Sequence, residues 1–351
     1  MTDDPRSRGD GPFEGDTVSV GVVGVGSLGY HHVRILSGLP GVRMEGFYEK
    51  RPERTRQVER ELGVPGRESL EELLDDVEAV VVAVPTTDHE EVACAALERG
   101  IHVLIEKPIA PSLDAADRIL ETARQNDALV QTGHVERFNS AVRAAQDYLD
   151  RPLFIESHRL APFVPRSTDV AVVLDLMIHD VDLVQSLVGT PIRDIAATGV
   201  PVLTPSVDIA NARLSFEGGA VANLTASRVS MEKMRKIRIF QPSGYLSLDL
   251  AKGTGEFLRL KDELPVLSGS GPEDVPEAIS AGEGGLLDLV ERVPLEGDQA
   301  EPLARELENF RDAVLGRAEP AVSGEAGRNA LLVSLSIEKR IESHVADTHP
   351  A

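Results

Sequence analysis

The chain has 351 residues and a formal net charge of −22 at pH 7, which argues against binding to a nucleic-acid backbone or an anionic membrane surface. This length suits two domains of roughly 100–200 residues each, and no stretch approaches the ~20 apolar residues that cross a bilayer. Because Cys94 is the only cysteine, no intrachain disulfide can form, and we expect a cytoplasmic protein.

The acidic surface has two explanations that the sequence leaves open. The cations are mostly arginine, with only seven lysines in the chain. Such a surface can keep a protein soluble at high salt, where screening relieves self-repulsion. Genomic base composition can produce the same bias without any adaptation.

Strands alternate with helices in the first part of the chain. Residues 1–16 are polar and are expected to form a disordered tail. Apolar runs and helical spacing predict, in order, Val18–Val23 (strand), Leu28–Leu39 (helix), Val42–Tyr48 (strand), Pro52–Leu62 and Leu70–Leu74 (helices), Ala79–Val84 (strand), His89–Leu97 (helix), His102–Ile105 (strand), Leu113–Asn126 (helix) and Leu129–Thr132 (strand). This alternation predicts a doubly wound α/β domain over residues 17–134, with a parallel sheet covered on both faces.

After about His134 the pattern changes to consecutive strands. The predicted helices are Ser140–Leu149, Val172–Leu187, Leu303–Leu315 and Gly324–Ser343. The predicted strands are Leu153–Arg159, Ile195–Gly199, Ile209–Phe216, Ala220–Ser227, Lys236–Gln241 and Tyr245–Asp249, with one more near Leu287–Val293 in the otherwise irregular stretch 262–301. Short turns between strands indicate a mainly antiparallel sheet. We therefore expect residues 135–351 to form an α+β domain.

A dinucleotide-binding fingerprint follows the first strand. It reads Gly24-Val25-Gly26-Ser27-Leu28-Gly29 and opens a helix. The three glycines permit the tight turn, the close approach of a pyrophosphate and the packing of helix on strand. Glu49 stands 20 positions after Gly29, where a carboxylate accepts from the adenosine ribose hydroxyls. The competing interpretation is a glycine-rich turn with a solvated Glu49.

The choice of cofactor depends on Glu49 and its neighbours. A carboxylate repels a 2′-phosphate, so Glu49 favours NAD. Lys50, Arg51 and Arg54 stand close by in sequence and can neutralise that repulsion, so NADP is not excluded.

Two segments carry groups for hydride-transfer chemistry. Glu106-Lys107-Pro108 follows the strand ending at Ile105, and ligands gather at the carboxyl ends of strands in a doubly wound sheet. Asp175, His179 and Asp182 share one helix face at i, i+4 and i+7. A histidine beside carboxylates suits a general base for an alcohol proton. Metal binding and a solvated polar face are the alternatives for this helix, and we expect no metal.

The sequence resembles the Gfo/Idh/MocA family, which includes glucose–fructose oxidoreductase and inositol dehydrogenase. The resemblance covers about Val18 to Ser343 and rests on the glycine fingerprint, on Pro85-Thr86-Thr87-x-His89, on Glu106-Lys107-Pro108, on Asp175-x-x-x-His179-x-x-Asp182 and on Pro320-Ala321-Val322-Ser323-Gly324-Glu325. It implies a Rossmann domain followed by an open-faced antiparallel sheet whose outer face forms subunit contacts. We therefore expect a homo-dimer or homo-tetramer.

The resemblance also implies roles for particular residues. Lys107 touches the nicotinamide and the substrate hydroxyl, His179 is the acid/base, and Asp175 orients the substrate or His179. The expected cofactor-binding residues are Gly24, Gly26, Ser27, Leu28, Gly29, Glu49, Lys50, Arg54, Pro85, Thr86, His89, Glu106 and Lys107.

Within the family, the segment Gly133–Asn139 looks most like members that act on nucleotide-linked amino sugars. In members of that type, arginine-rich loops hold the diphosphate, and the resemblance implies this role for Arg159 and Arg166, before the Asp175 helix. The expected substrate-binding residues are Lys107, His134, Arg137, Asn139, Arg159, Arg166, Asp175 and His179. For Arg137 and Asn139, a structural hydrogen-bond network is an equal alternative.

The expected reaction is oxidation of a ring secondary alcohol of a sugar to a ketone. A dehydrogenase of a free sugar or inositol is the main alternative, a reductase of a non-sugar substrate is another, and a catalytically silent NAD-binding sensor is the alternative from a different class.

Overall fold

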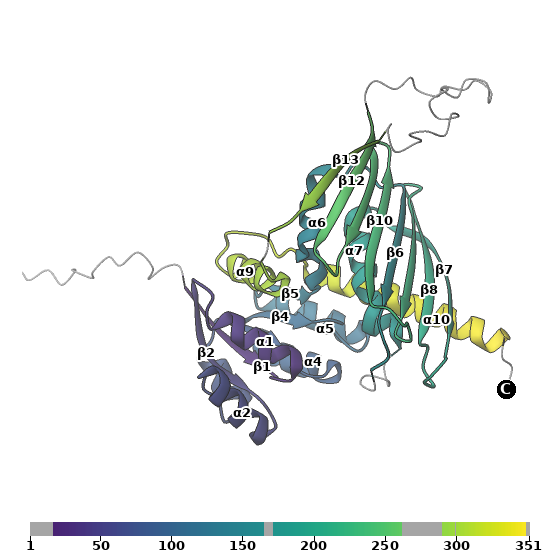
Figure 1. Ribbon diagram of the computed structural model, residues 1–351. Helices are drawn as coiled ribbons and strands as arrows, with labels where there is room; N and C mark the ends of the chain where they lie inside the picture. The colour runs from purple at the N-terminus through teal and green to yellow at the C-terminus, as the bar shows by residue number, and fades with distance from the viewer. Residues whose placement is uncertain (1–16, 165–170, 262–289, 299, 349–351) are drawn as a thin grey trace, which may run out of the picture. The chain divides into compact units, whose positions relative to one another are not determined.

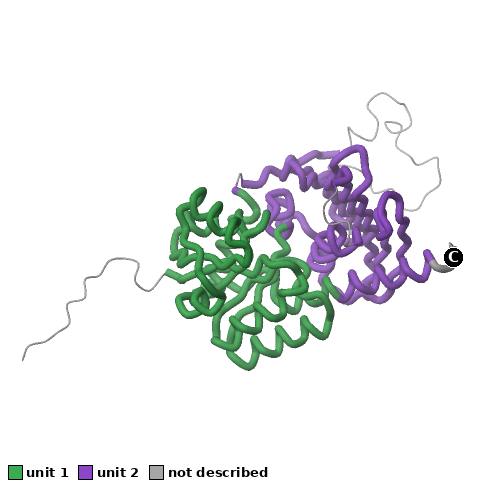
Figure 2. Tube along the Cα trace, turned by 90° about the horizontal axis from the view of Figure 1, so that it is seen from below, with its two compact units in different colours: residues 1–135, 301–331 green, residues 136–300, 332–351 purple. Residues whose placement is uncertain are grey.

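The computed structural model describes residues 17–164, 171–261, 290–298 and 300–348, which form two compact units. One consists of residues 1–135 and 301–331, and the other of residues 136–300 and 332–351 (Figure 2). The predicted tail, residues 1–16, lies outside the described residues.

The first unit contains a parallel five-stranded sheet in the order β2-β1-β3-β4-β5 (Figure 1). Its strands are β1 Val18–Val23, β2 Val42–Tyr48, β3 Ala79–Val82, β4 His102–Glu106 and β5 Val130–Gly133. Strands β1 and β3 are buried along their whole length, as a sheet covered on both faces requires. The chain reverses direction across the sheet at β1, and ligands bind beside such a switch point, at the carboxyl ends of the strands.

The helices of this unit confirm the predicted alternation. They are α1 Ser27–Leu36, α2 Pro52–Leu62, α3 Leu70–Asp75, α4 His89–Leu97 and α5 Leu113–Gln125, with a 3₁₀ turn, η1, at Thr86–Asp88. Local sequence explains their ends: Ser69 and Ser112 cap the first turns of α3 and α5, and Gly63 ends α2 in the left-handed conformation.

Residues 301–331 pack with the first unit, although the sequence analysis assigned them to the second domain. Helix α9 (Pro302–Val314) places Leu303, Leu307 and Phe310 in one core with Val33 and Leu36 of α1. The sequence pattern of α9 shows that the helix has an apolar face but not which core that face joins. This is why the domain boundary was predicted differently.

The second unit contains an eight-stranded sheet in the order β13-β12-β11-β10-β6-β9-β8-β7. Its strands are β6 Phe154–Leu160, β7 Ile192–Val200, β8 Ile209–Phe216, β9 Val221–Ser227, β10 Met234–Gln241, β11 Gly244–Asp249, β12 Thr254–Leu260 and β13 Val290–Glu296. All neighbouring pairs are antiparallel except β6 and β9, which confirms the mainly antiparallel prediction. Strand β12 was not predicted.

Helices cover one face of this sheet. They are α6 Ser140–Ala145, the π-helix η4 Val173–Met177, α7 Ile178–Val188 and the part of α10 (Gly324–Thr348) that follows residue 331, with short 3₁₀ turns at Val135–Phe138 (η2) and Gln146–Tyr148 (η3). Their apolar side chains share a core with the inward side of the strands. None of the described helices combines the length and the apolar character needed to cross a membrane.

Candidate active site

The glycine fingerprint forms the turn that the sequence predicted. Gly24 has a φ of 84°, in the left-handed region that favours glycine. A Cβ on Gly29 would lie 1.9 Å from the Gly24 carbonyl oxygen, so only glycine lets the helix pack here. A Cβ on Gly26, in contrast, would meet no atom within 4 Å. Gly26 therefore borders open space, into which a pyrophosphate fits.

Helix α1 begins directly after this turn with its amide groups available. No side chain caps it, and its first turn carries no acidic residue. The free N–H groups and the positive end of the helix dipole suit a phosphate. Ser27 and Leu28 lie exposed in this first turn.

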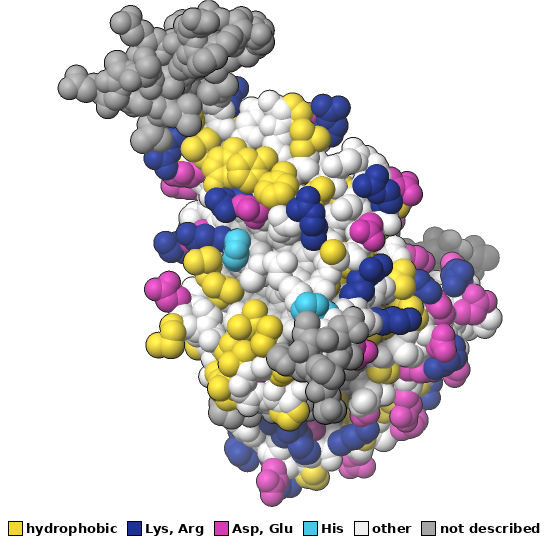
Figure 3. Space-filling model, turned by 90° about the vertical axis from the view of Figure 1, so that its right-hand side faces the viewer, with side chains coloured by type: hydrophobic (Ala, Val, Ile, Leu, Met, Phe, Trp, Pro, Cys, Tyr) yellow, Lys and Arg dark blue, Asp and Glu magenta, His cyan; other side chains and the backbone are white. Residues whose placement is uncertain are grey.

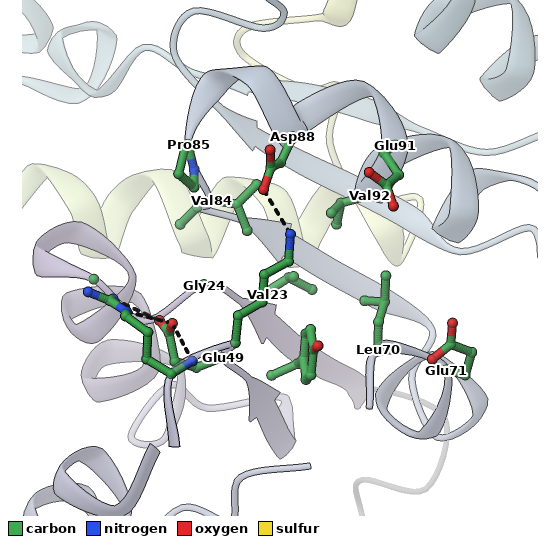
Figure 4. A pocket seen from close by; sticks show the side chains of 15 residues that line it. Val23, Gly24, Glu49, Leu70, Glu71, Val84, Pro85, Asp88, Glu91 and Val92 are labelled. Atoms are coloured by element: carbon green, nitrogen blue, oxygen red, sulfur yellow. Dashed lines mark hydrogen bonds and ion pairs between the residues drawn. The ribbon is translucent and has the colours of Figure 1, made fainter. Parts of the chain in front are cut away.

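A cavity of about 670 Å³ lies beside the fingerprint, entirely within the first unit (Figure 4). A volume of this order is typical of cofactor sites. The residues that line it come from the ends of β1, β2 and β3 and from the following loops and helices: Val23, Gly24, Gly26, Tyr48, Glu49, Lys50, Arg51, Leu70, Glu71, Ala83, Val84, Pro85, Asp88, Glu91 and Val92.

Glu49 lies in this cavity with a carboxylate that is already fixed. It accepts from the Val25 amide at 3.1 Å and from Arg51 in a bidentate pair at 2.8 and 3.0 Å. Burial acts to raise the pKa of Glu49, but the hydrogen bonds from Arg51 and Val25 outweigh it and hold the pKa below its ordinary value. The carboxylate is therefore ionised at neutral pH, and its hydrogen bonds fix its orientation.

Lys50 and Arg54 both bind protein groups, and Lys50 also lines the cavity. Nζ of Lys50 lies 3.0 Å from Asp88, and the ion pair crosses the view in Figure 4. Arg54 donates to the carbonyls of Val25 (2.7 Å) and Gly26 (3.0 Å), so it stiffens the fingerprint turn. Arg51, in contrast, is bound directly to the Glu49 carboxylate.

The Pro85–His89 segment divides between the cavity and the interior. Pro85 lines the cavity, and Thr86 is half-buried in η1. His89 is only 1% exposed, and its ring nitrogens lie 3.0 Å from the Pro108 carbonyl and 3.1 Å from the Val84 carbonyl. The ring therefore lies behind the cavity wall, and its expected cofactor contact stays a prediction.

Glu106, Lys107 and Pro108 follow β4 at the same edge of the sheet. Glu106 lies 2.7 Å from Nε2 of the fully buried His32, which belongs to α1. It also accepts from the Lys107 backbone amide at 3.3 Å. The Lys107–Pro108 peptide bond is cis.

The second unit holds the predicted acid/base pair. Asp175 lies in the π-helix η4 and His179 in the first turn of α7, and both are half-buried. A π-helical turn beside an α-helix is frequent at functional sites. Asp182 does not share their exposure, because it is 2% exposed and pairs with Arg137.

Arg137, Asn139 and Arg159 form a buried network in the second unit. Arg159 is 4% exposed and donates to both oxygens of Asp180 at 2.9 Å and to Glu136 at 2.9 Å. Asn139 donates to Glu136 and to the Leu250 carbonyl, and its side-chain oxygen caps α6. These contacts favour the hydrogen-bond network over direct substrate contact.

Two further predicted substrate-binding residues are His134 and Arg166. His134 is fully buried after β5. Arg166 lies outside the described residues.

Sequence reasoning missed several residues that shape the site. His32 belongs to a Tyr30-His31-His32 run with no motif that marks it, and Leu70 and Val92 look like ordinary core positions. Arg51 was named as a neighbour that can neutralise repulsion of a 2′-phosphate, but its direct pair with Glu49 was not predicted.

Comparison with known proteins supports the geometry. Residues 18–134 match a family described as an oxidoreductase family with an NAD-binding Rossmann fold, Gfo/Idh/MocA, and residues 134–247 match the C-terminal domain of the same family. UDP-N-acetylglucosamine 3-dehydrogenase of Acidithiobacillus ferrooxidans is 34% identical over 92% of this chain and 97% of its own length.

Other relatives extend the same picture. Myo-inositol 2-dehydrogenase of Thermotoga maritima is 26% identical over 92% of this chain and 96% of its own length. A solved structure of the Acidithiobacillus ferrooxidans protein has a TM-score of 0.82 at 32% identity, covering 93% of this chain and 98% of that one. Taken with the fingerprint and the Glu106-Lys107-Pro108 segment, these matches establish that the chain belongs to the Gfo/Idh/MocA oxidoreductase family and is an enzyme of the dehydrogenase type.

Proposed function

We propose that this enzyme oxidises a ring secondary alcohol of a nucleotide-linked amino sugar to a ketone, with NAD as the hydride acceptor. The observation that carries the proposal is Lys107, which follows β4 directly at the carboxyl edge of the dinucleotide-binding sheet. The similarity to a UDP-N-acetylglucosamine 3-dehydrogenase over nearly the whole chain supports the substrate class. The single cysteine supports a cytoplasmic location.

The residues divide the chemistry between the two units. The substrate carbon loses a hydride, which NAD accepts when bound, and the hydroxyl loses a proton to His179. Lys107 stabilises the negative charge that develops on the oxygen. Asp175 lies one turn before His179 and orients it.

The cofactor preference follows from the fixed charge of Glu49. Its carboxylate can accept from both ribose hydroxyls and would repel a 2′-phosphate. Because Arg51 is bound to that carboxylate at both of its oxygens, its charge is directed to Glu49 rather than to a phosphate. We therefore propose NAD over NADP.

The substrate assignment is tested by mixing the protein with NAD and a sugar panel. The panel contains UDP-N-acetylglucosamine, UDP-N-acetylgalactosamine, free N-acetylglucosamine and two inositols, and the readout is the absorbance of reduced cofactor. We expect turnover with a UDP sugar at least tenfold faster than with the free sugars. Faster turnover of inositol would favour the alternative dehydrogenase, and NADH binding without any turnover would favour a sensor.

The catalytic roles are tested by Lys107→Ala and His179→Ala. Each is expected to lower kcat by about 10²–10⁴-fold, the range for loss of a general acid or base. NADH affinity should stay within a few-fold in both variants, since the cavity lining contains neither residue. Full activity in either variant would overturn the assignment.

We also propose that the outer sheet face joins copies of this chain. The rings of Phe240 and Tyr245 stack there, and the Phe154 ring lies tilted beside Phe240. Apolar side chains gather near one end of that face (Figure 3). Exposed apolar patches of this kind mark association surfaces. Light scattering should give a dimer or tetramer for the natural chain and a smaller species for Phe240→Asp.

A further inference from the structure

Two buried histidines contact the segment that carries Lys107. His32 of α1 reaches Glu106, with 2.7 Å between Nε2 and Oε1, and His89 of α4 reaches Pro108, with 3.0 Å between Nδ1 and the carbonyl oxygen. Their exposed fractions are 0% and 1%. All five residues lie in the first unit, so the residue before Lys107 and the residue after it are each held by a histidine.

The surroundings of His32 assign its proton. Its Nδ1 atom has no hydrogen-bond partner among the described residues. An N–H there would be buried without an acceptor, which costs about 1–3 kcal/mol. The proton therefore belongs on Nε2, from which the ring donates to Glu106. Because Glu106 also accepts from the Lys107 amide, His32 fixes the carboxylate that holds the Lys107 backbone.

His89 faces two groups that can only accept. Nε2 lies 3.1 Å from the Val84 carbonyl, and Nδ1 lies 3.0 Å from the Pro108 carbonyl. A neutral imidazole has one N–H, whereas the protonated ring has two. The protonated ring therefore joins both carbonyls, and the neutral ring hydrogen-bonds only one of them. Val84 lines the cofactor cavity, so His89 links the cavity wall to the Lys107 segment.

The elements packed against α4 determine how easily His89 is protonated. Burial lowers the pKa of His89 below its ordinary value, and the backbone carbonyls and Glu106 offset part of that shift. Asp88 of η1 also interacts electrostatically with the ring. Strand β3 has no titratable side chain, and Arg118 of α5 is paired with Glu90. His89 therefore exchanges its proton on the acid side of neutrality.

We propose that His32 and His89 are positioning residues that hold Lys107 at the end of β4, and that the hold from His89 depends on its protonation. The proposal rests on the proposed catalytic role of Lys107. The position of the lysine then follows pH through a ring that is buried behind the cavity wall.

The first test is ¹⁵N NMR of the histidine rings, which needs no substrate. The chain has nine histidines, and the His89 signals are identified by their loss in His89→Gln. We expect His89 to pass from a doubly protonated to a neutral ring as pH rises, and we expect the neutral ring of His32 to carry its proton on Nε2. A neutral His89 in a single tautomer at every pH at which the protein is folded would overturn the pH dependence.

The second test reads Lys107 directly. With seven lysines in the chain, ¹³C-methylated lysine side chains give few signals, and Lys107→Arg identifies the relevant one. The Lys107 signal should follow the His89 titration in the natural protein and lose that dependence in His89→Gln. His102→Gln is the matched control, because His102 begins the same strand and bonds the Leu129 amide at 3.0 Å. A Lys107 signal that responds equally in both variants would overturn the positioning role.

Kinetics separate positioning from general damage. His32→Leu should lower kcat by about tenfold or more, as small misplacements of catalytic groups do. His32→Gln should recover much of the loss, since an amide can still donate to Glu106, and KM for NAD should change less than kcat in both. Equal loss in the two variants would contradict the hydrogen-bond role. If Lys107→Ala keeps full activity, the proposed function fails, whereas the two NMR tests still decide whether the histidines hold Lys107.

Discussion

The two units surround their candidate functional residues with different buried basic side chains. In the first unit, His32 and His89 lie against the Lys107 segment. In the second unit, Arg159 and Arg137 bind Asp180 and Asp182, which flank the turn after His179. Histidine changes its charge near neutral pH, whereas arginine does not. The comparison shows that the side chains around Lys107 include groups whose charge can change with pH, whereas the cations near His179 keep their charge.

The largest effect that would test this comparison is loss of the Arg159 guanidinium. Arg159→Met leaves Asp180 buried without its cation and leaves Glu136 only its contacts with Asn139 and Arg235, so it should lower the free energy of unfolding of the second unit by about 3–5 kcal/mol. Hydrogen exchange followed by mass spectrometry measures each unit separately. Arg292→Met is the control, because it breaks an exposed pair with Glu256 on the same sheet and should change little. If Arg159→Met lowered the free energy of unfolding as little as the control does, the buried Arg159 pairs would not be important for the stability of the second unit.

A somewhat smaller effect concerns the cofactor preference, which depends on the first unit alone. Glu49→Ser removes the ribose acceptor and releases Arg51, so the ratio of the NADPH to the NADH dissociation constant should fall about tenfold or more. Fluorescence of the reduced cofactors gives both constants. Glu45→Ser, on the same strand, breaks only the pair with Arg43 and should leave the ratio unchanged. A changed ratio of dissociation constants in Arg159→Met would contradict the claim that cofactor preference depends on the first unit alone.

Acidification should weaken the first unit. Burial lowers the pKa of both His89 and His102, so the unfolded chain takes up protons at a higher pH than the folded unit does. Stability present above the ordinary histidine pKa is then lost as pH falls from about 7 to 5, by at most about 1.4 kcal/mol per pH unit for each ring. Urea unfolding across this range measures the slope. His102→Gln should reduce it, and an unchanged slope would contradict the assignment.

The smallest expected effect has the opposite sign and lies in the second unit. Burial, with a contribution from Glu342, raises the pKa of Glu338 to about 7. The folded state then favours the neutral acid. The contribution of Glu338 to the free energy of unfolding is fully present below about pH 4.5 and is lost as pH rises through 7. Glu338→Gln should therefore raise the melting temperature at pH 8 more than at pH 5. Equal shifts at both pH values would argue for a packing effect instead.

Local sequence patterns were enough to predict the helices and strands whose ends are marked by proline, glycine or a clear change in apolar spacing. Helix α2, from Pro52 to Leu62, and strand β8, from Ile209 to Phe216, match their predicted bounds because proline, glycine and alternating apolar residues determine them locally. Strand β12 was missed because Gly255 and two charged residues interrupt its apolar pattern, and its one inward aromatic, Phe257, has its partners on other strands.

The site divides in the same way. Gly24, Gly26 and Glu49 were predictable because the fingerprint is a local motif with a local physical reason. The partners of His89 and Arg159 were not, because their rings and guanidinium groups bind segments 19 to 23 residues away that only the folded chain brings close.

The chain passes from one unit to the other three times, after residues 135, 300 and 331. Exchange of genes between relatives by a single crossover near residue 135 would thus transfer the cofactor site without α9. The recipient's own α9 would then have to fill the space against Val33 and Leu36 with side chains selected for a different partner. Hybrid enzymes of this family should therefore work best when the N-terminal segment and residues 301–331 come from the same parent.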